Sequence, residues 1–121
     1  MRVIALEEHY ATTEFLRGPG TWLASRPGIV EPAGDLGDGR IAAMDQAGVD
    51  LAVLSLAAPG VEQLDPDDAV RLARDCNDQL AAAVRRYPDR LAASPPCPPA
   101  PPTGRPTNSS GRCAGSGFPA R

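Results

Sequence analysis

Two short runs of apolar residues constrain the fold of this 121-residue chain more than any other feature. They cover residues 3–6 and 51–56, are rich in branched side chains and do not alternate with polar residues. Such runs are typical of strands buried on both faces of a parallel sheet. Helical patterns follow them over residues 40–47 and 66–87, and a third strand begins near residue 91. This alternation of strands and helices predicts an α/β fold with a parallel sheet.

Turn and cap residues support the boundaries of both predicted helices. Gly48 is a typical C-terminal stop for the first helix, with Ile41, Met44 and Ala47 on one face. Asp65 is an expected N-cap of the second helix and Pro66 its first residue. Its apolar stripe is predicted to contain Ala69, Ala73, Cys76, Leu80, Ala83 and Val84. Residues 10–39 show little periodicity and many glycine and proline turn signals, so we expect a long loop there.

The composition changes abruptly at residue 94. Residues 94–121 contain no acidic residue but 8 of the 14 prolines, and Phe118 is their only large apolar side chain. Such a segment cannot bury enough surface to offset chain entropy, so we expect a disordered Pro/Gly/Ser-rich tail after a folded part at residues 1–93. Residues 94–113 can be assigned codons that, after one nucleotide is restored before residue 94, encode a different sequence in the shifted frame. That sequence has the pattern of a strand, a turn and an amphipathic helix. We therefore hypothesise a frameshift, which the gene sequence would test.

Charge and composition exclude several classes of function. The net charge is −3 and every basic residue is arginine, without a basic run that would indicate a nucleic-acid surface. No stretch approaches the roughly 20 apolar residues of a membrane span. The three cysteines, Cys76, Cys97 and Cys113, form no paired framework, which favours reduced thiols and a cytoplasmic location. Cys76 is expected to be a core residue, and Ser55 lacks the glycine-rich turn of a nucleophilic serine.

The candidate chemistry lies at the end of the first strand, at Glu7, Glu8 and His9. Alternation along a regular strand would point Glu7 and His9 to one side and Glu8 to the other. A carboxylate and an imidazole suit zinc, and carboxylates also suit manganese. In α/β barrels, catalytic groups sit at this end of the strands. The pair therefore suggests a metal site, with a solvated strand end as the alternative.

Five segments in this order resemble the start of the amidohydrolase-2 family. The closest branch contains the γ-resorcylate and 2,3-dihydroxybenzoate non-oxidative decarboxylases. The segments are ALEEHYAT at residues 5–12, RIAAMDQAGVD at 40–50, LSLAAPGV at 54–61, ARDCND at 73–78 and YPDRL at 87–91. The resemblance implies the N-terminal part of a (β/α)8 TIM barrel, about two and a half β/α units long. It also implies that Glu7 and His9 are ligands of one divalent metal, zinc or manganese.

The resemblance implies a carboxy-lyase of an aromatic or unsaturated carboxylic acid, and the parent enzyme could form homo-oligomers. Charge and hydropathy predict no nucleic-acid and no membrane partner. The metal would polarise substrate oxygens as a Lewis acid, and a later acidic residue would protonate the ring carbon. His9 is the only histidine, and two protein ligands do not complete a catalytic zinc site. We therefore expect a truncated, inactive chain with no catalytic residue of its own. The alternatives are a metal-dependent hydrolase of the same superfamily and a non-enzymatic fragment with a Pro-rich interaction tail.

Overall fold

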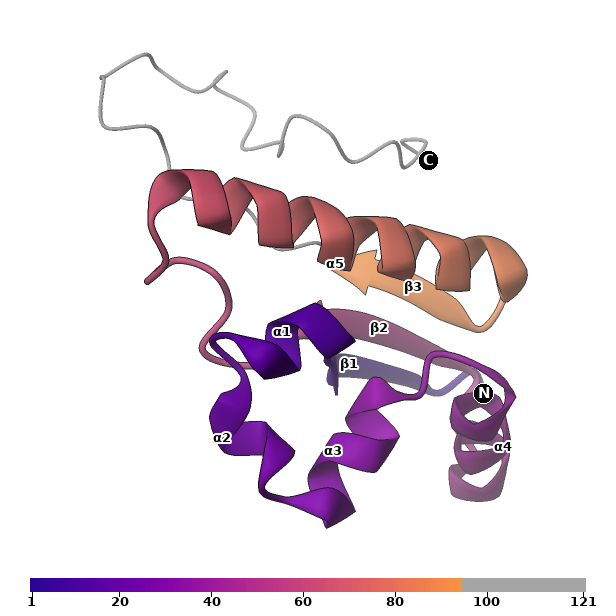
Figure 1. Ribbon diagram of the computed structural model, residues 1–121. Coiled ribbons are helices and arrows are strands. Elements are labelled where there is room, and N and C mark those ends of the chain that lie inside the picture. Colours follow the sequence, from indigo (N-terminus) through magenta and orange to yellow (C-terminus); the bar gives the residue numbers. More distant parts are fainter. Residues whose placement is uncertain (95–121) are drawn as a thin grey trace.

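The computed structural model describes residues 1–94, which form three strands and five helices (Figure 1). In chain order these are β1 (Ile4–Tyr10), α1 (Thr13–Arg17), α2 (Thr21–Ala24), α3 (Pro27–Gly34), α4 (Asp38–Ala47), β2 (Leu51–Leu56), α5 (Pro66–Arg86) and β3 (Leu91–Ser94). Predictions for residues 95–121, including the tail, its interaction role and the frameshift, lie outside the described residues.

The strands form one parallel sheet in the order β1-β2-β3. Helix α4 lies between β1 and β2 in the chain, and α5 lies between β2 and β3. The predicted α/β fold with parallel strands is therefore confirmed. Strand β3 extends to Ser94, one residue beyond the predicted end of the folded part.

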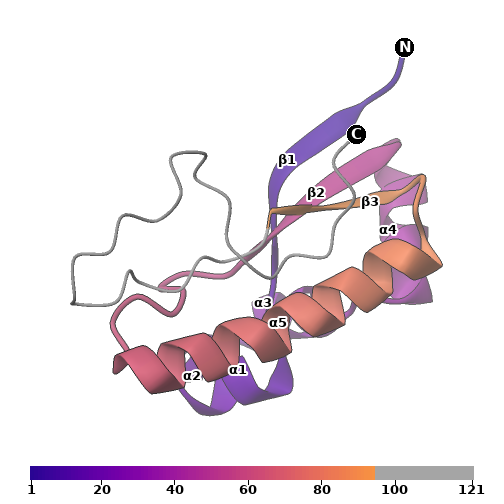
Figure 2. The same ribbon diagram turned by 90° about the horizontal axis from the view of Figure 1, so that it is seen from above.

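The helices cover one face of the sheet. In Figure 2, α4 and α5 lie on the same side of the three strands. Burial agrees with this arrangement, since Ala52 and Leu54 of β2 are buried while Val53 and Ser55 between and after them are only partly buried. The core therefore lies between the sheet and the helices. Among residues 1–94, no helix covers the opposite face, which we call the open face.

Helix α5 contributes the largest part of the core. Its 21 residues begin at Pro66 after the predicted N-cap Asp65, although the Asp65 side chain makes no capping hydrogen bond. The buried positions include five of the six predicted stripe residues, with Val84 only partly buried. Leu72, which was not predicted to belong to the stripe, is also buried. This face packs on the sheet, and the Tyr10 hydroxyl donates a hydrogen bond to the Cys76 carbonyl at 3.3 Å.

The expected long loop between β1 and α4 is wrong, because this segment contains the short helices α1, α2 and α3. None is longer than 8 residues, so none spans enough turns for a helical period to show in the sequence. Local signals support them, since the Thr12 hydroxyl accepts a hydrogen bond from the Phe15 amide at 3.2 Å and Pro27 begins α3. Burial of Phe15, Leu23 and Ala33 anchors the three helices to the core.

Helix α4 ends as predicted but packs loosely. Gly48 adopts φ 71°, a left-handed conformation that glycine adopts without the steric cost of a side chain. Of the predicted apolar face, Met44 is buried, Ile41 is partly buried and Ala47 is exposed. Only part of this face therefore reaches the sheet, which leaves a cavity between α4 and the strands.

Candidate functional site

The predicted site residues lie at the carboxyl end of β1. All three strands are parallel, so this end of β1 lies at the same edge of the sheet as the carboxyl ends of β2 and β3. Glu7, Glu8 and His9 are all exposed there. This is the edge at which catalytic side chains gather in parallel α/β proteins.

A bulge in β1 decides which way these side chains face. Three residue steps separate Ala5 from Glu8, whereas only two steps separate their partners on β2. One extra residue of β1 is therefore inserted, and Glu7 lies there with φ 57°, a conformation that is uncommon for residues other than glycine. The register places Glu8 and Tyr10 on the same face as Ala5, toward the helices, and His9 on the open face. Regular alternation thus holds for Glu8 and His9 and is interrupted at Glu7.

His9 contacts a serine of the neighbouring strand. The two residues are register partners, so both side chains project from the open face. The distance between His9 Nδ1 and Ser55 Oγ is 3.3 Å, within hydrogen-bond range. On β3, Ser94 is the register partner of Ser55. The open face therefore carries a row of polar residues, His9, Ser55 and Ser94, across the carboxyl ends of the three strands.

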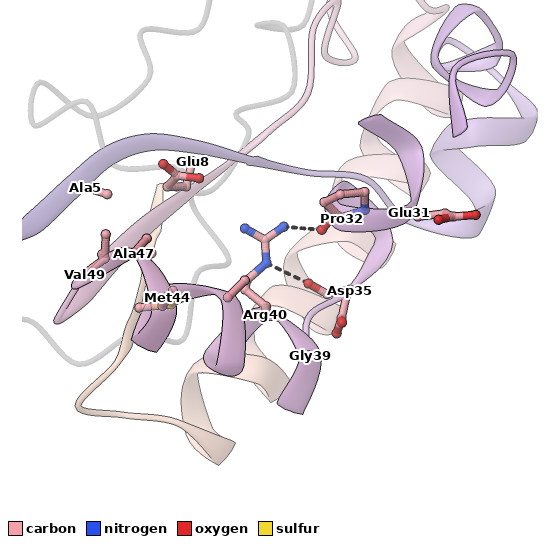
Figure 3. A pocket seen from close by; sticks show the side chains of 12 residues that line it. Ala5, Glu8, Glu31, Pro32, Asp35, Gly39, Arg40, Met44, Ala47 and Val49 are labelled. Atoms are coloured by element: carbon pink, nitrogen blue, oxygen red, sulfur yellow. Dashed lines mark hydrogen bonds between the residues drawn. The ribbon is translucent and has the colours of Figure 1, made fainter. Parts of the chain in front are cut away.

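On the other face, Arg40 fixes the end of β1 through backbone contacts, and Figure 3 shows those with Pro32 and Asp35. Its guanidinium donates hydrogen bonds to three backbone carbonyls, those of Asp35 at 2.6 Å, Pro32 at 2.8 Å and His9 at 3.0 Å. One side chain at the start of α4 thereby joins the end of α3 to the strand that carries His9. Arg40 was not among the site residues predicted from the sequence, although its place beside the glycine-rich turn at residues 34–39 was a usable signal.

Arg40 lies close to carboxylates in this region. Burial lowers the pKa of Arg40 from its ordinary value, and the nearby carboxylates of Glu8 and Asp35 oppose that shift. These groups border a cavity of about 520 Å³ between α4 and the sheet. Its other walls are mostly apolar and include Met44 and Ala52. The cavity lies on the helix side of the sheet, so His9 does not line it.

The donor atoms at the end of β1 suit a divalent metal but do not complete its coordination. Glu7 offers a carboxylate and His9 offers an imidazole, and these are ordinary ligands of zinc and manganese. Within residues 1–94, no group of three or more histidine, cysteine, aspartate or glutamate side chains lies close enough to hold a metal. The described residues can therefore supply at most part of a metal site.

The buried cysteine belongs to the core. Cys76 is fully buried, and its Sγ lies 3.5 Å from the Thr12 hydroxyl. Burial raises the pKa of the Cys76 thiol, which disfavours the reactive thiolate. The prediction that Cys76 is a core residue is confirmed. Within the part that the structure describes, no helix has the length and hydropathy to cross a membrane.

Comparisons with known proteins find several decarboxylases of aromatic acids. The chain is 37% identical over 91 residues to a γ-resorcylate decarboxylase of Polaromonas, which covers 73% of this chain and 28% of that protein. It superposes with a TM-score of 0.70 and 34% identity on a 5-carboxyvanillate decarboxylase of Novosphingobium aromaticivorans complexed with manganese and a nitrobenzoic acid ligand, covering 78% of this chain and 33% of that one.

A dihydroxybenzoic acid decarboxylase of Polaromonas with bound manganese and 2-nitroresorcinol gives a TM-score of 0.70 at 35% identity, covering 81% of this chain and 31% of that one. No model of a protein family matches the chain. The resemblance to the decarboxylase branch of the amidohydrolase-2 family is confirmed, as is the match to the N-terminal part of its barrel. The chain spans less than a third of the length of the curated relative.

Proposed function

We propose that this chain carries the opening β/α units of a metal-dependent, non-oxidative decarboxylase of the amidohydrolase-2 family. The observation that carries this proposal is the conjunction of 37% identity to a γ-resorcylate decarboxylase with a Glu-x-His pair at the carboxyl end of β1. The substrate class we propose is an aromatic carboxylic acid with a hydroxyl group beside the carboxylate. The relatives with bound manganese support a divalent cation as the cofactor.

In this proposal Glu7 and His9 are the residues that would hold the metal. When bound, the metal supplies Lewis-acid polarisation of substrate oxygens. Arg40 holds the His9 backbone, and the bulge turns the imidazole onto the open face. Turnover requires further ligands beyond those of residues 1–94, because catalytic zinc sites use three protein ligands and leave one open position. A hydrolase of the same superfamily is the weaker alternative, since the relatives described above are decarboxylases.

A chimera tests the proposal. Residues 1–94 replace the matched segment of the Polaromonas γ-resorcylate decarboxylase, and carbon dioxide release is measured with added Mn²⁺. We expect release that is abolished by His9→Asn or Glu7→Gln. Glu8→Gln is the matched control because it alters a neighbouring carboxylate on the opposite face, and we expect it to retain activity. Equal activity of the His9→Asn and parent chimeras would refute the proposed metal ligands.

Three further proposals concern the whole protein. The reduced, buried Cys76 supports a cytoplasmic location. Self-association of the complete enzyme remains a prediction, which light scattering tests. The division into a folded part at residues 1–93 and a tail at residues 94–121 is likewise retained as a proposal.

A further inference from the structure

We propose that Ser55 is a positioning residue for His9, and that its hydroxyl accepts a hydrogen bond from Nδ1–H so that Nε2 is presented to a divalent cation. This inference rests on the proposed function. It concerns a residue of β2, whereas the sequence pattern points only to β1.

The register provides the geometric basis. His9 and Ser55 are paired on adjacent parallel strands and project from the same face. The separation of 3.3 Å joins Nδ1 of the ring, the nitrogen nearer the backbone, to Oγ. A ring held through Nδ1 leaves Nε2 as its only free nitrogen, on the open face of the sheet. The bulge is essential, because without the extra residue His9 would face the helices instead.

Coordination chemistry gives the contact its role. A neutral imidazole that binds a metal through Nε2 carries its proton on Nδ1, and that proton needs an acceptor. In metal sites this acceptor fixes both the tautomer and the ring orientation, and its loss typically weakens metal binding by about 10- to 100-fold. Among the hydrogen bonds of residues 1–94, the Ser55 hydroxyl is the partner recorded for the His9 ring.

The chain suits a direct test because His9 is its only histidine, so both ring ¹⁵N signals belong to this residue, and couplings to the ring protons distinguish Nδ1 from Nε2. The full chain is titrated with Zn²⁺ at about pH 8. The dissociation constant and the ring ¹⁵N shifts are measured for the parent chain, Ser55→Ala, Ser55→Thr and Ser94→Ala. Ser94→Ala is the matched control, since it removes the next hydroxyl along the same row.

We expect Zn²⁺ to shift the Nε2 signal while Nδ1 stays protonated. Ser55→Ala should weaken binding about 10-fold, whereas Ser55→Thr, which keeps a hydroxyl, and Ser94→Ala should not. Zn²⁺ bound through Nδ1, or equal affinity of Ser55→Ala and the parent chain, would overturn the role of Ser55 alone. Absence of any Zn²⁺ effect on the ring would overturn the proposed metal site and this inference with it, so the two failures are distinguishable.

Discussion

Replacing Arg40 with methionine tests whether one side chain holds the end of β1 in place. Methionine fills a similar volume but cannot donate hydrogen bonds. The change leaves the carbonyls of Asp35, Pro32 and His9 without their shared donor. The Pro32 carbonyl keeps a hydrogen bond from the Asp35 amide at 3.3 Å, so part of its hydrogen bonding survives the change.

The expected loss of stability in Arg40→Met follows from the removal of three hydrogen bonds of a charged donor. Each contributes about 1.5–3 kcal/mol when buried. Arg40 is only partly buried, so water can reach the freed carbonyls and the lower end applies, and bonds that share one donor group do not add fully. We therefore expect Arg40→Met to lower the free energy of unfolding by about 2–3 kcal/mol. Arg40→Lys keeps the charge but loses the planar guanidinium group. Its free energy of unfolding should therefore lie between those of the parent chain and Arg40→Met.

Urea unfolding followed by circular dichroism measures the effect, with Arg71→Met as the control. Arg71 is highly exposed and pairs with Asp68 three residues earlier, so its loss should cost less than about 0.5 kcal/mol. Amide hydrogen exchange adds a local measurement, since the end of β1 should lose protection in Arg40→Met. If Arg40→Met and Arg71→Met unfold at the same urea concentration, the hydrogen bonds of Arg40 do not secure the site.

Three further predictions concern the core and the backbone. Burial raises the pKa of Tyr10, so its neutral hydroxyl stabilises the fold below the ordinary tyrosine pKa near 10, and each pH unit above that value costs up to about 1.4 kcal/mol. Tyr10→Phe should lose about 1 kcal/mol at pH 7 and flatten this alkaline decline in urea unfolding. Gly48→Ala should cost about 1–2 kcal/mol at φ 71°, while Gly28→Ala, with open space around it, should not destabilise in thermal melts. Leu54→Ala should cost about 2–5 kcal/mol, against less than about 0.5 kcal/mol for the exposed Leu6→Ala, as measured by urea unfolding.

The sequence predicted those elements that contain several apolar residues with one period or a clear boundary residue. The apolar run of β2 and the stripe of α5 each contain several residues that repeat one period, and Gly48 and Pro66 mark boundaries through fixed backbone preferences. Helices α1 to α3 carry no such repetition, since each contributes a single buried side chain to the core. Their existence depends on tertiary contacts, for example the hydrogen bond from the Ala11 amide to the Ala33 carbonyl at 3.0 Å.

The partners of the candidate site were harder to predict than its residue types. A carboxylate next to an imidazole is visible in one segment, but Arg40 and Ser55 reach His9 across 31 and 46 positions of sequence. Such contacts depend on strand register and on where the first turn of α4 lies relative to β1. Neither follows from local periodicity. The sequence therefore indicates the candidate ligands, whereas the residues that orient them become apparent only in the folded structure.

The bulge in β1 shows how the core determines which face His9 occupies. Ala5 and Tyr10 both lie on the helix side of the sheet, and five residue steps separate them, an odd number that regular alternation would place on opposite faces. One inserted residue restores the burial of Tyr10, whose side chain is fully enclosed. The same insertion moves His9 to the open face, opposite Ser55, and places Glu7 in a backbone conformation that costs a non-glycine residue about 1–2 kcal/mol. Burial of one aromatic side chain therefore compensates for local strain and, at the same time, orients the imidazole that we propose as a metal ligand.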